Sequence, residues 1–415
     1  MAFAPNSPTL AYCILFSCII AWGSYAPLRR TSPKVDGPAF GSLAFCAEFT
    51  WSCLISFTFG SIGHTHTNST ATATATAATT IVFDSESNFF ARLSSDVSSN
   101  PGQSSLILLG GAFVGFGDSI CFTVLSYVPS SLAFPLIVGT CIVVGTTISY
   151  IVDGSNKPIL LFVGVVLLIP SILLLGWAQN SVSKETTDTA TETKTETANE
   201  IHSSVGNTVT TTAKEVATPK TKEVATWKWI VLLITIGTIN SLWGPLSTLG
   251  RRNVSVHSGY FLLTMGRILV QFPSQSVTQM WLYRKPPLNI FSQMYHVPRR
   301  GKCSAFGCGV LIGYGYYTYF IGSNVVNKSA AFAISNCSPL WTIVIGVCVQ
   351  KDLKRYNQRA KIAVALSTGC FIAAVAVLSL SATWFTGCTG IHTRHTSTLV
   401  HTEGKGFSFS ITCSK

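Results

Sequence analysis

Three ionisable side chains lie inside long apolar stretches of this 415-residue chain: Glu48, Asp118 and Arg267. Such a group costs about 2.5–3.5 kcal/mol at the centre of a membrane helix on insertion scales, so it is a candidate for function. A carboxylate beside an arginine can bind and release a proton, and a substrate that uses the same charges would be coupled to that proton. We therefore predict that Glu48 or Asp118 pairs with Arg267 and couples transport to protons. The alternative is a buried ion pair that only fixes the helix register.

Charged residues are scarce in the chain as a whole, which limits the kind of protein it encodes. They make up 11% of the residues, against roughly 25% in an average soluble domain, while 47% are hydrophobic. So few charges would leave a soluble domain without a wettable surface. The composition therefore excludes an ordinary soluble enzyme, a disordered scaffold and a small secreted domain held by disulfides. We expect a membrane protein whose main solvent is the lipid bilayer.

The net charge of +12 and the 13 cysteines fit the same interpretation. The basic residues form short clusters between apolar runs, which is typical of cytoplasmic loops and argues against a nucleic-acid partner. Most cysteines lie inside the apolar runs, and the 8 histidines are dispersed. We therefore expect no metal site, no cofactor and no enzymatic activity.

The candidate residues must be positioned by membrane helices, each of which needs about 20 apolar residues. Ten such stretches are present: residues 9–28, 39–62, 105–126, 130–151, 158–178, 228–249, 259–282, 304–323, 329–349 and 360–384. Pro135, Pro245 and Pro339 lie within them. Each proline removes a backbone donor and is expected to bend its helix where it lines a cavity. We predict an all-α polytopic membrane protein with ten transmembrane helices.

Polar segments and basic residues predict the topology. Residues 63–104, 179–227 and 386–415 are polar; we interpret the second as a solvated linker and the third as a flexible tail. Loops on one side carry 13 lysines and arginines and loops on the other carry 5, without the linker. The richer side is expected in the cytoplasm with the linker, and both termini outside. The Asn68 sequon then lies outside, where it is open to glycosylation.

The two ends of the chain resemble each other. The third and fourth predicted spans resemble the eighth and ninth at a constant offset of 198 residues. They share 8 identities over about 41 gapless positions, including Gly111 with Gly309. Trp22 matches Trp243 at an offset of 221. Each half, residues 1–178 and 228–385, therefore holds five spans, and an odd number gives the halves opposite orientations. Inverted repeats are typical of alternating-access transporters, which bind their substrate near the midplane.

Several stretches are similar to the ureide permease family. The most specific is Val143 to Asp153; others are Phe57 to Gly63, Asn88 to Leu93, Leu282 to Arg284 and Ala373 to Leu378. The resemblance covers the first five spans well and the last four moderately. It implies the drug/metabolite transporter fold and proton-coupled import of allantoin, uracil and xanthine across the plasma membrane. Plant members have a Gly-Lys motif in the central loop; it is lacking in residues 179–227, so no ATP role is carried over.

A planar ureide or oxo-heterocycle needs flat aromatic surfaces, with donors and acceptors at its rim. We therefore add Trp22, Trp243 and Tyr316 to Glu48, Asp118 and Arg267 as predicted substrate-binding residues. Further candidates are Tyr317, Tyr319, Asn240 and Asn336. Packing in the core or at the membrane interface is the alternative for each aromatic side chain.

Two other function classes remain as alternatives. A related transporter could carry sugars or nucleotide-sugars across an internal membrane, but phosphorylated cargo asks for several intramembrane basic residues, and only Arg267 is available. A membrane-embedded enzyme would need clustered histidines or carboxylates at one interface. The inverted repeat argues against a channel or a receptor.

Overall fold

A computed structural model describes most of the apolar stretches of the chain and some of the segments between them. The described residues are 7–30, 35, 37–60, 89–124, 130–153, 159–174, 177–178, 226–280, 286, 289–326, 328–348 and 357–389. They form helices and turns, and no strand occurs among them. The Asn68 sequon and nearly all of the predicted linker and tail lie outside these residues.

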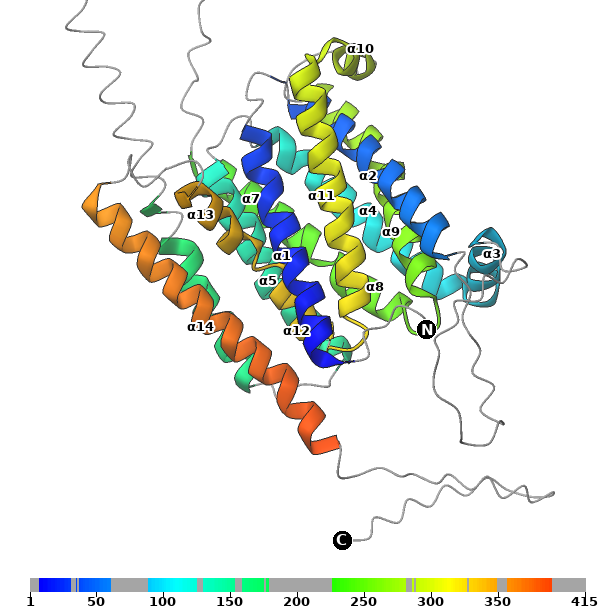
Figure 1. Cartoon of the computed structure of the whole chain (residues 1–415). Coiled ribbons are helices and arrows are strands. Elements are labelled where there is room, and N and C mark those ends of the chain that lie inside the picture. Colours follow the sequence, from blue (N-terminus) through cyan, green and yellow to red (C-terminus); the bar gives the residue numbers. More distant parts are fainter. Residues whose placement is uncertain are drawn as a thin grey trace, which may run out of the picture.

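The helices follow the apolar stretches of the sequence (Figure 1). Their bounds are α1 Pro8–Arg30, α2 Gly37–Gly60, α3 Phe89–Ser99, α4 Pro101–Val124, α5 Ser130–Asp153, a helix at Ile159–Leu174, α7 Thr226–Ser241, α8 Trp243–Gly250, α9 Val256–Thr278, α10 Asn289–His296, α11 Arg299–Gly322, α12 Lys328–Ser335, α13 Ser338–Cys348 and α14 Gln358–Thr389. Helix α3 lies in a segment that we predicted to be polar and outside the membrane, and α14 runs beyond residue 384, where we expected its end.

Within the described part of the chain, five helical segments are long and apolar enough to cross a membrane. Their spans are Thr9–Arg29, Gly37–Gly60, Pro101–Phe122, Val231–Gly250 and Gln358–Leu378, and two shorter apolar helices are Leu136–Val152 and Ile159–Leu174. Helices α9 and α11 form where spans were predicted, with 23 and 24 residues, but are not among the five. Polar residues such as Arg267 and Gln271 lower the mean hydropathy of α9, and glycines and tyrosines lower that of α11.

Two of the predicted spans are broken helices. The span at 228–249 is interrupted at Leu242, between α7 and α8, and the span at 329–349 is interrupted at Asn336 and Cys337, between α12 and α13. Pro245 and Pro339 stand in the first turn of the helix that follows each break. A proline is tolerated there because its missing N–H has no partner within the helix. The prolines therefore mark where new helices begin.

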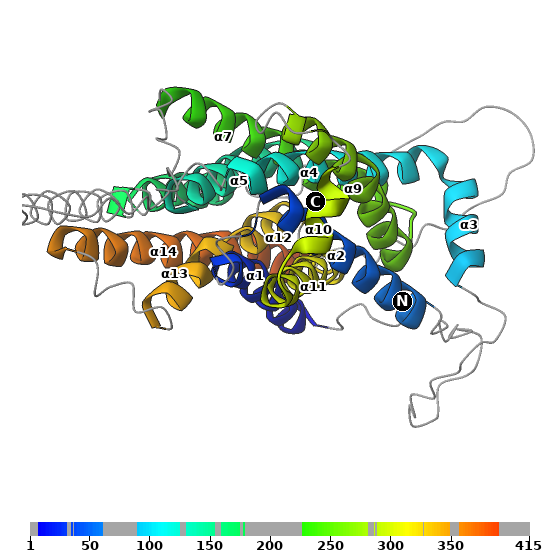
Figure 2. The same cartoon turned by 90° about the horizontal axis from the view of Figure 1, so that it is seen from above.

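Seen from above, the bundle has two layers (Figure 2). Helices α4, α5, α7 and α9 form one layer, and α1, α2, α11, α13 and α14 lie in the other. Each layer thus combines helices from both halves of the sequence. Within the layers, α4 packs on α9, and α11 packs on α1 and α2.

Glycines set the distance between the closest helices. A Cβ atom at Gly115 of α4 would lie 2.7 Å from the carbonyl oxygen of Arg267, and one at Gly309 of α11 would lie 2.8 Å from the amide nitrogen of Glu48. Both obstacles are backbone atoms, which cannot move aside. Small residues therefore bring α4 against α9 and α11 against α2, and this contact positions Glu48 and Arg267.

Candidate functional site

The three predicted ionisable residues meet in the interior of the bundle. The Arg267 guanidinium donates through one nitrogen to Glu48 Oε1 at 2.6 Å and through the other to Asp118 Oδ2 at 2.7 Å. Arg267 and Glu48 are each 1% exposed. The predicted pairing is therefore present, and both carboxylates bind Arg267 at once. Because Glu48 belongs to one layer and Arg267 to the other, this network also links the two layers.

The surroundings of Arg267 compensate in part for the removal of its charge from water. Its guanidinium carbon lies 5.1 Å from the ring centre of Phe45 and 4.6 Å from that of Tyr316. Cations are attracted to aromatic faces, more strongly when desolvated. One positive charge nevertheless faces two carboxylates, so the network carries a net negative charge when both are ionised. A proton on either carboxylate would bring it to neutrality.

Asp118 also faces a cavity between the two layers. Its Oδ1 accepts a hydrogen bond of 3.1 Å from Asn240 Nδ2, and its side chain is 21% exposed. The free space amounts to about 720 Å³, counting the part that opens to the surroundings. The lining residues are Trp22, Tyr25, Val114, Asp118, Cys121, Phe122, Ile137, Val138, Cys141, Asn240, Trp243, Ile312, Tyr316, Asn336 and Ser338.

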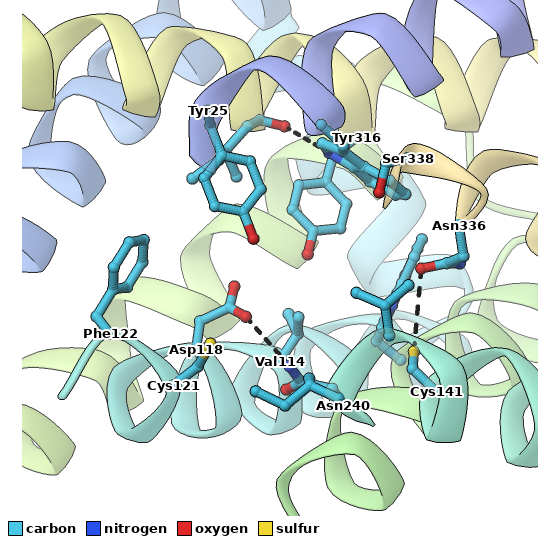
Figure 3. A pocket seen from close by; sticks show the side chains of 15 residues that line it. Tyr25, Val114, Asp118, Cys121, Phe122, Cys141, Asn240, Tyr316, Asn336 and Ser338 are labelled. Carbon is cyan, nitrogen blue, oxygen red and sulfur yellow. Dashed lines mark hydrogen bonds between the residues drawn. The ribbon is translucent and has the colours of Figure 1, made fainter. Parts of the chain in front are cut away.

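Aromatic rings form one wall of the cavity. Trp22, Trp243 and Tyr316 contact one another edge to face, with ring centres 5.0–6.1 Å apart. The Trp22 indole N–H donates to the carbonyl of Ile312 at 3.3 Å, which fixes that ring. Figure 3 shows the hydroxyl groups of Tyr25 and Tyr316 directed toward the side of the cavity that holds Asp118. A flat molecule would meet ring surfaces on one side and polar groups on the other.

The breaks in the helices lie at the cavity. Asn240 and Trp243 lie on either side of the break between α7 and α8, while Asn336 lies in the break between α12 and α13 and Ser338 directly follows it. Figure 3 shows the Asn336 amide beside Cys141, whose thiol lies 4.0 Å from its oxygen. The expectation that proline-containing spans bend beside a cavity is met for Pro245 and Pro339.

The predicted site residues fall into three groups. Six line the cavity: Trp22, Asp118, Asn240, Trp243, Tyr316 and Asn336. Glu48 and Arg267 stand behind it and reach it through Asp118. Tyr317 and Tyr319 lie elsewhere: Tyr317 packs on Tyr260 and His257, and Tyr319 packs on Trp243 and below Arg251.

Several polar residues near the site were missed by sequence reasoning. Tyr25 is one, because a tyrosine near a helix end is typical of a membrane interface. Gln271, Gln275 and Gln279 are others, all of them buried. Their spacing in the sequence could have identified them, because they follow Arg267 at steps of four residues, which places them on one face of a helix. Among the described residues, no group of three or more histidines, cysteines and carboxylates is arranged to hold a metal ion.

Comparison with known proteins adds no relative: no protein-family model and no curated protein matches the sequence.

Proposed function

We propose that this protein is a secondary active transporter of the ureide permease type, which imports allantoin and related oxo-heterocycles such as uracil and xanthine together with protons. The cargo class rests on the family resemblance of the sequence. The transport mode rests on the cavity, which is lined by both halves of the chain and adjoins a buried network of charges. We place the protein in the plasma membrane with its central linker in the cytosol.

The proposed architecture is ten helices in two inverted repeats of five. Helix contacts that occur in matching pairs support it. In the proposed repeat, α1, α2, α4 and α5 correspond to the α7–α8 pair, α9, α11 and the α12–α13 pair. The contact of α4 with α9 then matches the contact of α11 with α2, and the contact of α1 with α11 matches that of the α7–α8 pair with α4. Likewise α5 contacts α7 and α8 as α1 contacts α12 and α13. A twofold relation in the membrane plane explains all three pairs.

The observation that carries the proposal is the pairing of cavity residues at the same offsets. Trp22 and Trp243 differ by 221, while Asp118 and Tyr316 differ by 198. Val114 with Ile312 and Val138 with Asn336 also differ by 198. Repeat-related positions thus face one space, as expected of a substrate site at a repeat interface.

Glu48 and Arg267 also fit the repeat. A Cβ atom at Gly309 would meet the backbone of Ala44 and Glu48, and one at Gly111 would meet the backbone of Leu263 and Arg267. Ala44 to Leu263 and Glu48 to Arg267 are both shifts of 219 residues. The two charges therefore occupy equivalent positions and pair with each other across the proposed symmetry axis. Opposite charges at one repeat position make the site itself asymmetric.

The charge of the site favours a neutral cargo. Arg267 already binds two carboxylates, so its positive charge is not available for a phosphate or a sugar nucleotide. A ureide is neutral and planar, and it offers N–H and C=O groups to Asp118, Asn240 and Asn336. A proton on the carboxylate pair would remove the excess negative charge when the cargo enters.

Uptake of labelled allantoin, uracil and xanthine into transport-deficient cells tests the proposal. Cells that express the protein should accumulate at least one of the three above the outside concentration, and a proton uncoupler should abolish the accumulation. Equal uptake by expressing and empty cells for all three would remove the cargo assignment. Accumulation that survives the uncoupler would remove the proton coupling and leave the cargo assignment standing.

A further inference from the structure

A seam of buried polar side chains runs between α2 of one layer and α9 of the other. The two helices run antiparallel, so that Ser52 meets Thr264, Glu48 meets Arg267 and Ser42 meets Gln275. Beyond α9, Gln279 donates to Gln293 of α10 at 3.0 Å. The seam thus continues from the ion pair to α10, which lies at the opposite end of the bundle from α3 (Figure 1).

The seam has two arms, one on each side of the Glu48–Arg267 pair, and they differ in their hydrogen bonding. On the α3 side, Ser52 bonds with Tyr260 at 2.7 Å and with Thr264 at 3.1 Å, and Tyr260 donates to the Gly313 carbonyl at 2.9 Å. This arm is closed next to Glu48 by bonds among protein groups. The hydroxyl of Ser56, one turn further, has no partner, but Ser52 separates it from Glu48 along α2.

The α10 side is not closed in this way. Gln271, Gln275 and Gln279 are at most 1% exposed. Both amide atoms of Gln271 lack a hydrogen-bond partner in the protein, as do Nε2 of Gln275 and Oε1 of Gln279. Glu48 Oε2 and Arg267 Nε lack one as well. Buried polar groups without a partner are costly away from water, and six of them belong to Glu48, Arg267 and the three glutamines that follow Arg267.

Water is the partner that fits these groups, because a single molecule both donates to a carbonyl and accepts from an amide N–H. From Arg267 to Gln279 is 12 residues of sequence, or about 18 Å of helix, which is more than half of a typical bilayer core. The glutamine amides do not ionise. They would hold the water molecules along which a proton leaves the Glu48 carboxylate toward the α10 end, which the predicted topology places in the cytoplasm.

We propose that Gln271, Gln275 and Gln279 hold a water-filled proton path between Glu48 and the α10 end of the bundle, separate from the cargo cavity. This inference rests on the proposed proton-coupled transport and assigns the proton a route that differs from that of the cargo. Cargo meets the charge network at Asp118, and protons meet it at Glu48. Arg267 binds both carboxylates and so couples the two events.

A variant without the amides tests the path in the full-length protein. Gln271→Met with Gln275→Met keeps the length of the side chains and removes their hydrogen bonds. In liposomes with a trapped pH dye, proton flux driven by allantoin or uracil should fall roughly tenfold or more, the range of typical coupling energies. Exchange of labelled cargo at equal pH should stay near the wild-type rate. Gln103→Met, at the start of α4, is the matched control and should change neither.

Three outcomes are distinguishable. Unchanged proton flux in the double variant would overturn the path while the proposed function stands. An equal loss of exchange and proton flux would also overturn it, because that result indicates structural damage. Wild-type protein that exchanges none of the cargoes would instead refute the proposed function.

A second measurement needs no transport. Gln275→Cys should react with a small charged methanethiosulfonate reagent on the order of tenfold faster than Leu269→Cys, because these reagents attack the hydrated thiolate. Leu269 is 56% exposed on the lipid-facing side of the same helix. Mass spectrometry of the α9 peptide gives the extent of labelling at each position and separates it from the native cysteines. Equally slow labelling at both positions would overturn the path.

Discussion

Arg267 holds two carboxylates with one positive charge, and this imbalance decides what each residue of the network does. Glu48 and Arg267 are sealed from the cavity, whereas Asp118 reaches it and also binds Asn240. Removing one carboxylate leaves a neutral pair, while removing the arginine leaves two buried negative charges. The three substitutions therefore have different consequences.

Asp118→Asn and Glu48→Gln should each uncouple transport from protons. Either change fixes the network at neutrality, the state that otherwise needs a proton. Accumulation of cargo under an inward proton gradient should fall roughly tenfold or more, while exchange at equal pH persists. Labelled-cargo uptake at acidic and neutral external pH measures this. If both variants still concentrate cargo in a pH-dependent way, neither carboxylate is the proton site.

Arg267→Gln should destabilise the protein strongly. Breaking a buried ion pair by removing one partner costs about 3–5 kcal/mol, because the remaining charge is left uncompensated. The triple variant Arg267→Gln, Glu48→Gln, Asp118→Asn should recover part of this loss. Size-exclusion chromatography of heated, detergent-solubilised protein gives the midpoint temperatures. A triple variant no more stable than the single one would show that charge is not the cause.

At the scale of the helices, glycine decides which elements meet. Gly111 and Gly115 of α4 lie on the backbone of α9, and Gly309 of α11 lies on that of α2. These contacts hold Arg267 and Glu48 at bonding distance. The broken helices add a second element-scale feature, since the loop residues between α12 and α13 bring Asn336 to the cavity.

Gly111→Ala should separate α4 from α9 and reduce the yield of folded protein. Its methyl group would collide with the Leu263 carbonyl, a backbone atom that cannot turn away. Gly369→Ala on α14 is the control, because a Cβ there meets nothing within 4 Å. That control should be neutral or stabilising by up to about 1 kcal/mol from helix propensity. Equal yields of the two variants would contradict the packing argument.

At the scale of the whole molecule, two layers built from both halves enclose the cavity (Figure 2). The Glu48–Arg267 pair and the α2–α9 seam cross between these layers. At the edge, α14 and the Ile159–Leu174 helix lie side by side, joined by reciprocal bonds between Ser171 and Ser367. A movement of one layer against the other would therefore act directly on the charge network.

The orientation of the molecule in the membrane is a prediction from its basic residues. An epitope inserted in the linker 179–227 should be reached by antibody only after the plasma membrane is permeabilised. Asn68 should carry a glycan that an N-glycosidase removes, and Asn68→Gln should abolish that shift. An epitope stained on intact cells would reverse the orientation and place the α10 end of the bundle outside.

By itself the sequence determined the helical class, the sites of most helices and the scarcity of intramembrane charge. These features follow from runs of apolar residues, which are local patterns that can be read directly from the sequence. It also indicated the arginine–carboxylate pairing, because Glu48, Asp118 and Arg267 are the ionisable residues that lie well inside the predicted spans.

Only the tertiary structure decided which residues face one another. The break at Asn336, the position of Tyr25 in the cavity and the separation of Glu48 from it depend on how helices are rotated and how closely they approach. Rotation and approach are set by contacts between residues more than a hundred positions apart, such as Gly115 with Arg267 and Gly309 with Glu48. No local pattern encodes such contacts, because each depends on the shape of both partners at once.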